Sequence, residues 1–450
     1  MNECNTELIV KESPAEPRQR AVTDLGPEME QALEQLGQEL DLEATARASG
    51  ALLRRRGVSR AKDLLRLVLG YSVLDLSLRL LGSWCVVVGL ADISKTALLH
   101  RLRKCRAWLG LLVMARLTRQ TGCAPPASNV RIKVVDASVI CQPGSQGTDW
   151  RLHLGFDLGR MCLAGLEVTD AHGAESLSRF AWRPGDVAIV DRGYAVRKEV
   201  GHVLGAGAGL LMRIGWLKLP LESQTGQPFD LMAWLQQAQR SPASQPQEIE
   251  VWVATPAGRF AMRLVAQAIP APAAEEARRR LHREAKKKGR TPDARSLCAA
   301  GFVLLLTNLP LAPWSAVQVL QLYRFRWQIE LVFKRLKSLL NLDGLRTRDP
   351  ELVQVYLLAK LLAALVLEQL QGHLTTHYPE WFASQERPLS VWRLTALLWA
   401  ELRQSVRGQL TLTRLLTVFP KLRRFLCDEP RKRLSQRVLA QSLLNGLCGC

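Results

Sequence analysis

Residues 322–337 read LYRFRWQIELVFKRLK, and this stretch decides how the rest of the chain is interpreted. Its polar side chains follow the spacing Y-x2-R-x3-E-x6-K, in successive steps of three, four and seven residues. The four residues are Tyr323, Arg326, Glu330 and Lys337. Such steps keep side chains on one face of a helix. The stretch therefore predicts a glutamate surrounded by a tyrosine and by cations that can contact phosphates.

This helix is expected to begin near Ser315 and to pack on a sheet through its apolar residues. Lys334, one turn after Glu330, joins the same face. The ordinary explanation of Glu330 is a surface salt bridge with Lys334 or Arg326, which stabilises a helix by only a few tenths of a kcal/mol. The alternative role for Tyr323 is structural, as a buried aromatic residue whose hydroxyl group forms a hydrogen bond.

Two aspartates upstream of the helix complete a set of carboxylates. Asp136 follows the apolar run Ile132–Val135, and Asp191 follows Val187–Val190. Both are therefore expected at the ends of short buried strands, where a hydrated cation can reach them. Asp191 also opens the turn DRGY, whose glycine is expected to permit the bend. Either aspartate alone is typical of a turn, but two on neighbouring strands suggest a metal site, with Glu330 as the best candidate for the third acid.

Three carboxylates of this kind suit a pair of Mg²⁺ ions, because Mg²⁺ prefers hard oxygen ligands and leaves positions open for water and phosphate. Two such ions activate an attacking water or 3′-hydroxyl group and stabilise the departing oxygen at a phosphodiester. This chemistry needs no histidine as a general base, so structural roles are expected for His153 and His172. The remaining acids on or beside these strands, Asp157, Asp170 and Asp186, lack a motif or the right position.

The spacing from Tyr323 to Lys337 resembles that of the bacterial DDE transposases of the insertion-sequence-four family. The segments VVDAS around Asp136 and DRGY from Asp191 match the two aspartate motifs of that family. Residues 169–175, which read TDAHGAE, are similar to the turn that precedes the family's fourth strand. The resemblance extends from the segment that begins at Asp92 through Arg346.

The resemblance implies an α/β fold with a ribonuclease H-like catalytic core, in which a strand-rich insertion separates the third acid from the first two. It also implies cleavage at the ends of the protein's own insertion sequence and transfer of the freed strands into target DNA. Asp136, Asp191 and Glu330 would be the catalytic and metal-binding residues, with two Mg²⁺ ions for which Mn²⁺ can substitute. The implied contacts to DNA are Tyr323, Arg326, Lys334, Lys337, Arg192, Arg346 and Arg348.

The partners implied by the family are double-stranded DNA, as element ends and as target, and a second copy of the chain in the end-paired complex. Some relatives place a tryptophan just before a Leu-Leu-Thr run, where it stacks on a flipped base during hairpin formation. Phe302 and Val303 stand there in this chain. Phenylalanine can also stack on a base, but this difference leaves a hairpin intermediate open.

Composition agrees with a nucleic-acid partner. The chain has 450 residues, with 61 Lys plus Arg against 41 Asp plus Glu and a formal charge of +20. The ten cysteines show no spacing typical of zinc sites, so reduced thiols in a cytosolic protein are expected. The resemblance to bacterial transposases implies a cytoplasmic, nucleoid-associated bacterial protein. Residues 1–20 are too polar for a secretory signal. The apolar run Leu352–Leu370 contains Gln354, Lys360 and Glu368, which favours a buried amphipathic helix over a membrane span.

Changes in composition and periodicity divide the chain into a polar tail (1–24), a helical DNA-end-binding domain (25–125), the catalytic core (126–345) and a C-terminal helical region (346–450). The core's strands are expected at Arg131–Val135, Leu152–Leu158, Leu163–Thr169, Val187–Val190, Gly209–Ile214 and Phe302–Leu306, with a helix at Glu175–Phe180. An insertion at about 215–300 is expected to carry a strand pair, Glu248–Ala254 and Arg259–Ala266.

Several basic segments allow two interpretations. A helix capped by Ser94 and beginning near Lys95 carries four Arg or Lys residues, as the reading helix of a helix-turn-helix does. A solvated basic face explains that helix equally well. Arg278–Arg290 is either a nucleic-acid contact or a solvated, partly disordered arm, and the runs Lys421–Arg424 and Arg431–Arg433 are more typical of solvated faces.

Two other functions are compatible with the same residues. One is a ribonuclease H-like nuclease that cuts without joining ends. The other is a catalytically retired transposase that only occupies DNA, although intact Asp136, Asp191 and Glu330 disfavour it.

Overall fold

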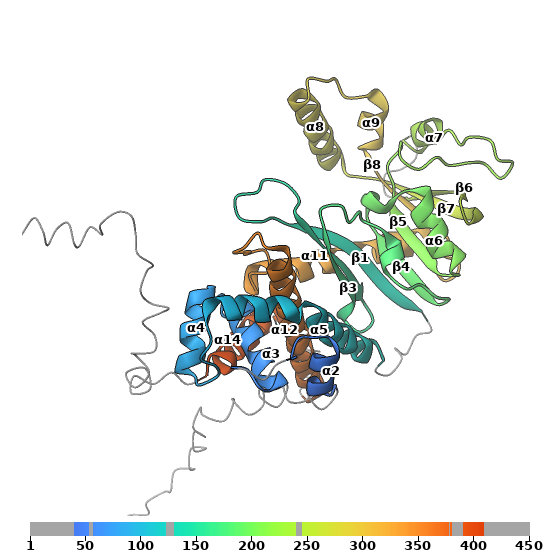
Figure 1. Ribbon diagram of the computed structural model, residues 1–450. Coiled ribbons are helices and arrows are strands. Elements are labelled where there is room, and N and C mark those ends of the chain that lie inside the picture. The colour runs from blue at the N-terminus through green and yellow to red at the C-terminus, as the bar shows by residue number, and fades with distance from the viewer. Residues whose placement is uncertain are drawn as a thin grey trace, which may run out of the picture.

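The computed structural model describes residues 40–53, 57–122, 130–239, 245–377, 379 and 390–408. The expected polar tail and the two basic runs near the C-terminus lie outside these residues. The described part consists of one eight-stranded mixed sheet, mostly antiparallel, with helices on both of its faces (Figure 1).

The strands follow the spatial order β3-β2-β1-β4-β5-β8-β7-β6. Their bounds are β1 Arg131–Ile140, β2 Trp150–Asp157, β3 Cys162–Asp170, β4 Asp186–Val190, β5 Gly209–Arg213, β6 Gln247–Thr255, β7 Gly258–Ala268 and β8 Phe302–Thr307. Only the pairs β1–β4 and β4–β5 are parallel. All the expected strands are therefore present, and the strand pair of the insertion does not form a separate unit, because β7 pairs with β8 and extends the core sheet.

The expected end of the first strand before Asp136 is wrong. The strand β1 continues to Ile140, because it pairs antiparallel with β2 along this length, from Lys133 opposite Asp157 to Ile140 opposite Trp150. Its parallel pairing with β4 nevertheless stops at Val134. Asp136 thus lies in the middle of β1, just beyond the last residue of β1 that pairs with β4.

Residues alternate between two hydrophobic cores across the sheet. Val134 packs into the core on the side of the long helices, whereas Val135 packs into the core with α6 (Arg197–Gly205) and α7 (Leu231–Ala238). This period-two alternation is what a sheet covered on both faces requires. The expected helix at Glu175–Phe180 is reduced to one 3-10 turn, η1 (Leu177–Arg179).

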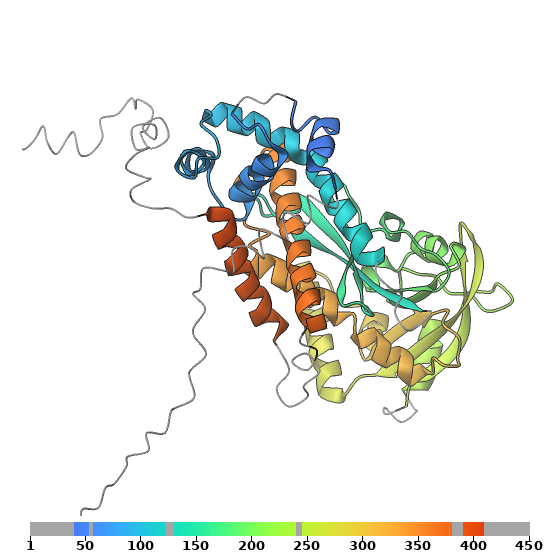
Figure 2. The same cartoon turned by 90° about the horizontal axis from the view of Figure 1, so that it is seen from below.

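The remaining helices are α2 Leu42–Ala48, α3 Ala61–Ser72, α4 Leu78–Val87, α5 Lys95–Gly122, α8 Ala271–Lys287, α9 Ala294–Ala299, α10 Ala316–Arg324, α11 Trp327–Lys334, α12 Pro350–His377 and α14 Val391–Arg407. The helix α12 contacts α3, α5 and α14, so helices from the two ends of the chain share one core (Figure 2). Although α12 is long and apolar enough to cross a membrane, most of its apolar window is buried by the protein.

The expected cap of α5 is confirmed, because Ser94 accepts a hydrogen bond from the amide of Ala97 at 3.2 Å. Two of the basic residues expected on this helix have partners in α12 or directly before it. Arg103 forms an ion pair with Asp349, and Arg106 donates to Gln354 at 3.2 Å. The helix-turn-helix interpretation stays a prediction, with fewer free cations than the sequence suggested.

Candidate active site

The three expected acids come from three different elements. Asp136 lies in β1, Asp191 caps the 3-10 turn η2 (Arg192–Tyr194) directly after β4, and Glu330 lies in α11. The helix α11 contacts β1 and β2 across the face of the sheet, and Ile329 and Phe333 are buried there. Glu330 follows the buried Ile329 and shares the guanidinium group of Arg326 with Asp136 of β1.

The expectation of one regular helix from Ser315 is corrected by the structure. Ser315 does cap α10 through a capping box with Gln318. Beyond Arg324, however, hydrogen bonds run to the third residue back, from the amide of Arg326 to the carbonyl of Tyr323 and from that of Ile329 to Arg326. This tightening separates α10 from α11. A π-helical turn, η3 (Arg335–Leu339), follows α11 and carries Lys337.

Arg326 joins two of the acids. Its guanidinium forms an ion pair with Glu330, and one of its nitrogens lies 3.5 Å from Oδ2 of Asp136. The salt bridge considered for Glu330 is thus made with Arg326. In the absence of another cation, this arginine supplies positive charge between Asp136 and Glu330.

The electrostatics of Asp136 show how closely the acids are grouped. Burial, together with the negative charges of Asp191 and Glu175, raises the pKa of Asp136 to about 6. The amide of Ala137, which donates to Asp136 at 2.8 Å, and the charge of Arg326 act in the opposite direction. Mutual repulsion of this kind is typical of a cluster of carboxylates that binds a cation.

Glu175 is the acid that the sequence did not assign. The motif at residues 169–175 was identified only as a turn, yet the carboxylate of Glu175 lies beside Asp191. A Cβ atom added at Gly193 would meet Oε2 of Glu175 at 2.7 Å and Oδ1 of Asp191 at 2.9 Å. Burial and the charge of Asp191 raise the pKa of Glu175.

The glycine of the DRGY turn therefore has a different role from the expected one. Its backbone is not in the left-handed region, and its amide donates to Oδ1 of Asp191 at 2.7 Å. Gly193 is needed because a side chain there would collide with two carboxylates.

The expected DNA-contacting residues are spread around these acids. Tyr323 is half-buried, and burial raises its pKa to about 12. Lys337 donates to the carbonyl of Val139 at 2.8 Å, at the end of β1 beyond Asp136. Lys334 instead lies over the ring of Trp392 in α14, 5.6 Å from its centre.

The three expected arginines differ in their contacts. Arg192 is exposed and follows Asp191 directly. Arg346 donates to the carbonyl of Asp75, and Arg348 donates to the carbonyl of Pro143 at 3.0 Å. Arg346 and Arg348 thus hold loops in place in this structure, and only Arg192 of the three is without a protein partner in the described chain.

Other acids near the sheet have structural partners away from the site. Asp186 is buried at the start of β4 between Arg131 and Lys133, at 2.8 and 2.9 Å. Asp157 pairs with Arg160, and Asp170 accepts from the amide of His172. Phe302 is buried at the start of β8, where it lines a pocket.

The donor chemistry of the site fits a divalent cation, because the side chains that converge on Asp136 and Asp191 are carboxylates. Within the described residues, no three of the acids, histidines or cysteines are close enough to form a finished metal site. The reason is visible in the contacts of Arg326, which draws Asp136 and Glu330 to itself. A bound cation would compete with this arginine for both carboxylates.

Comparison with known proteins decides the family. The family model described as "Transposase DDE domain" matches residues 131–366, which contain β1 to β8 and α10, α11 and most of α12. The chain belongs to the transposase DDE domain family. Members of the family are enzymes that act on DNA and in general use divalent metal ions, and membership implies a ribonuclease H-like core.

Curated relatives agree with this assignment. The chain is 38% identical over 344 residues to the putative transposase InsL for insertion sequence element IS186A of Escherichia coli (strain K12), covering 75% of this chain and 92% of the relative. It is 38% identical over 345 residues to the transposase for IS421 of Escherichia coli, with the same coverage. It is 27% identical over 272 residues to the transposase for IS231F of Bacillus thuringiensis subsp. israelensis, covering 52% and 55%. The resemblance to insertion-sequence-four transposases is thereby confirmed.

His153 has a structural position, since it is fully buried in β2 and its Nε2 lies 2.9 Å from the hydroxyl of Thr169. Burial and the charges of Arg179 and Arg151 lower the pKa of His153 to about 4. The unfolded chain therefore binds a proton here between pH 6.5 and 4 while the folded chain does not, so stability falls as the pH falls through this range. We expect His153→Gln to remove an acid-sensitive contribution on the order of 3 kcal/mol.

The measurement is the free energy of unfolding of both proteins at pH 7 and at pH 4.5. The difference between the two pH values should be smaller for His153→Gln. An equal pH dependence in the two proteins would show that His153 is not held in its neutral form.

Proposed function

We propose that this transposase cuts DNA at the ends of its own insertion sequence and joins the freed 3′ ends to a target, by the cut-and-paste route. The observation that carries the proposal is the position of Asp136 between the other two acids: it shares Arg326 with Glu330, and it is close enough to Asp191 for the two negative charges to interact. These acids would hold two Mg²⁺ ions, for which Mn²⁺ can substitute. The bound ions would supply an activated water or 3′-hydroxyl group and charge stabilisation at the departing oxygen.

The protein's own residues position the DNA. Once the acids bind cations, Arg326 is released from carboxylates and can pair with a phosphate beside the cleaved bond. Tyr323 and Lys337 flank it on α10 and η3, and Arg192 lies on the other side of Asp191. Lys334, Arg346 and Arg348 are proposed as outer phosphate contacts. They would exchange their present protein partners for DNA.

The other parts of the chain support the same role. We propose that the N-terminal helices 25–125 bind the element ends, that two copies of the chain pair two ends, and that the protein works in the bacterial cytoplasm with the nucleoid. The exposed cation Lys104 on α5 is available for a phosphate. The net charge of +20 favours this partner over a neutral or basic one.

The test uses labelled duplexes that carry the DNA flanking this chain's coding sequence, an unlabelled target plasmid, and either Mg²⁺ or a chelator. We expect metal-dependent cuts at the element ends and labelled products joined to the plasmid. Cutting of any duplex without joining would favour the nuclease alternative. Binding without cutting in Mg²⁺ or Mn²⁺ would favour the retired DNA-binding form.

A further inference from the structure

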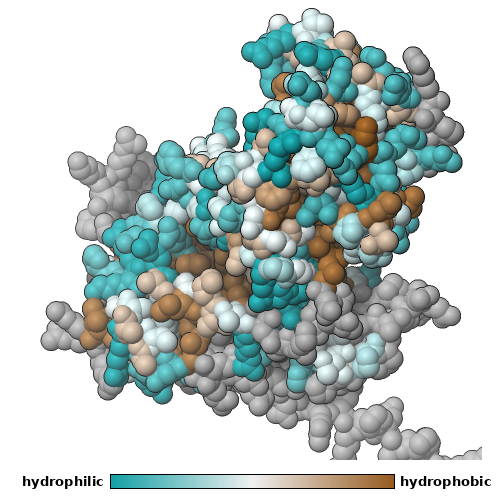
Figure 3. Space-filling view, turned by 90° about the vertical axis from the view of Figure 1, so that its right-hand side faces the viewer, coloured by the Kyte–Doolittle hydropathy of each residue, from teal (hydrophilic) through white to brown (hydrophobic). Residues whose placement is uncertain are grey.

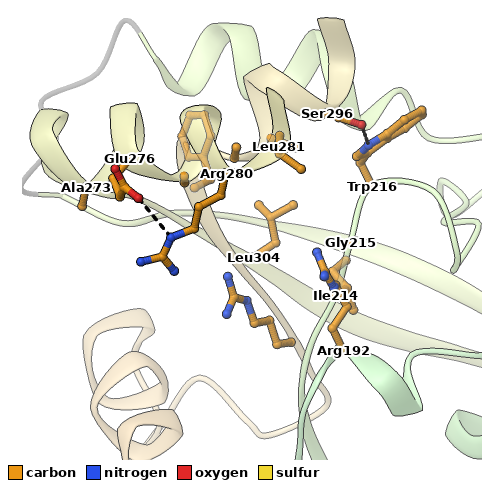
Figure 4. Close-up of a pocket in the computed structure, with 15 residues that line it drawn as sticks. Arg192, Ile214, Gly215, Trp216, Ala273, Glu276, Arg280, Leu281, Ser296 and Leu304 are labelled. Carbon is orange, nitrogen blue, oxygen red and sulfur yellow. Dashed lines mark hydrogen bonds and ion pairs between the residues drawn. The ribbon is translucent and has the colours of Figure 1, made fainter. Parts of the chain in front are cut away.

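A cavity of about 540 Å³ lies beside the proposed active site, between the ends of β5 and β8 and the helices α8 and α9 (Figure 4). Three arginines from three separate segments line it, namely Arg192, Arg213 and Arg280. Arg192 follows Asp191 directly, so one of the residues that line the cavity is a neighbour in the chain of a proposed catalytic acid. A strand of DNA held at the acids would pass this opening as it leaves the site.

Two of these arginines have no hydrogen-bonding or ion-pairing partner among the described residues. Arg192 and Arg213 are exposed, and neither forms a hydrogen bond or an ion pair with any residue of the described chain. Two exposed guanidinium groups that line one cavity repel each other, and a bound anion reduces that repulsion. This part of the cavity therefore fits a phosphate.

The wall of the cavity is apolar and held in place. Trp216 donates from its indole nitrogen to the hydroxyl of Ser296 in α9 at 3.1 Å, and Arg295 lies over its ring at 4.4 Å. Phe302 and Leu304 of β8 complete this wall. A cationic opening beside a fixed apolar wall suits a polymer of phosphates, sugars and bases better than a free inorganic anion.

The helix α8 extends the positive surface away from the cavity. Its exposed face carries Arg279, Arg280 and Arg283, and a single acid, Glu276, serves all three, at 3.4, 3.3 and 2.7 Å. Figure 4 shows Arg280 reaching from α8 toward the strands with Glu276 beside it. Hydrophilic side chains dominate the end of the molecule that carries α8 and α9 (Figure 3).

We propose that the cavity and the exposed face of α8 together bind the phosphodiester backbone of the DNA strand that leaves the active site, with Glu276 as an internal counter-anion that the phosphates displace. This inference rests on the proposed function. Glu276 holds three exposed arginines in ion pairs that are individually weak in water. A phosphodiester, whose two non-bridging oxygens share one negative charge, can replace the carboxylate, since Arg pairs with both groups in the same forked geometry.

The matched control lies on the same helix. Arg278 points to the other side of α8, where it donates to the carbonyl of Leu297 at 3.2 Å. Arg278→Gln removes a charge from α8 but not from the proposed DNA-binding face. Glu250, an exposed acid on β6 within the same insertion, provides Glu250→Gln as the control for Glu276→Gln.

The experiment measures the affinity of the full chain for an end-carrying duplex over a series of salt concentrations. All proteins carry Glu330→Gln, and a chelator is present, so that cleavage does not contribute. We expect Arg280→Gln with Arg283→Gln to weaken binding roughly tenfold, and to reduce the slope of log affinity against log salt by about 1.8. Arg278→Gln should change both quantities less. Glu276→Gln should strengthen binding about threefold or more, whereas Glu250→Gln should have a smaller effect.

Two outcomes separate this inference from the proposed function. If the Glu330→Gln parent binds the duplex and the double arginine variant binds like Arg278→Gln, the inference about α8 is overturned and the proposed function stands. If Glu276→Gln weakens binding, its role as a counter-anion is likewise overturned. A parent that binds no DNA at all would overturn both.

Discussion

Glu330→Gln is expected to lower the rate of end cleavage roughly a thousandfold or more while DNA binding is retained. Loss of a charged ligand removes several kcal/mol of charge stabilisation at the reacting phosphate, and about 4 kcal/mol corresponds to a thousandfold in rate. The fold should survive, because Glu330 is partly exposed and its partner Arg326 keeps Asp136 as a neighbour. The measurement is single-turnover cleavage of an end-carrying duplex in Mg²⁺, with binding measured separately in chelator.

The control for this variant is Glu351→Gln. Glu351 is also a helical glutamate near an arginine, 3.6 Å from Arg103, but it lies at the start of α12 away from the site. Its replacement should leave the cleavage rate within about twofold. If Glu330→Gln cuts at the natural rate, Glu330 is not a metal ligand. Glu175 would then be the acid to test next, because it already lies beside Asp191.

Much of the sheet could be predicted because its local sequence signals agree with its tertiary environment. The run before Asp191 is apolar on both faces, as a strand covered by helices on both sides requires. The run before Asp136 is apolar except for Lys133. The length of β1 could not be predicted in the same way. Residues after Asp136 remain extended because β2 pairs with them, and this long-range contact leaves no local signal in the sequence.

The candidate site shows the same division. The spacing of Tyr323, Arg326 and Glu330 carried enough helical periodicity to place them together. Between α10 and α11, backbone amides donate to the carbonyl three residues earlier and not four residues earlier, as they would in an α-helix. The pattern of apolar residues in the sequence does not indicate this change. Glu175 was missed because it approaches Asp191 only when the turn after β3 packs against the turn after β4.

The polar residues of α12 favour a buried amphipathic helix over a membrane span, and one of them, Lys360, is itself buried. Its side chain is fully buried, and its ammonium group donates to Asp75 at 3.0 Å and to the carbonyls of Leu340 and Asn341 at 2.7 and 2.8 Å. Burial lowers the pKa of Lys360 to about 8, and the charge of Asp75 opposes that shift. The lysine therefore remains largely protonated at neutral pH.

Lys360→Met is expected to lower the free energy of unfolding by about 3 to 5 kcal/mol, which is typical when one partner of a buried ion pair is removed. Asp75 would lose its countercharge and keep two neutral donors, the hydroxyl of Tyr356 at 2.7 Å and the side-chain amide of Asn341 at 3.4 Å. Two backbone carbonyls directly after η3 would also lose their donor. The measurement is denaturant unfolding at pH 7, with Lys104→Met as the control, because Lys104 is an exposed lysine on α5.

A second variant tests whether the charge of Asp75 is the cause. In Lys360→Met with Asp75→Leu, no buried charge is left unpaired, so part of the lost stability should return. The ion pair connects the loop between α3 and α4 with α12, and the same ammonium group also binds the carbonyls of Leu340 and Asn341 after η3. Lys360 therefore ties the N-terminal helices to the segment that follows the helix carrying Glu330. If the free energy of unfolding of Lys360→Met differs from that of the natural protein by less than about 1 kcal/mol, the packing of α12 alone holds these two parts together.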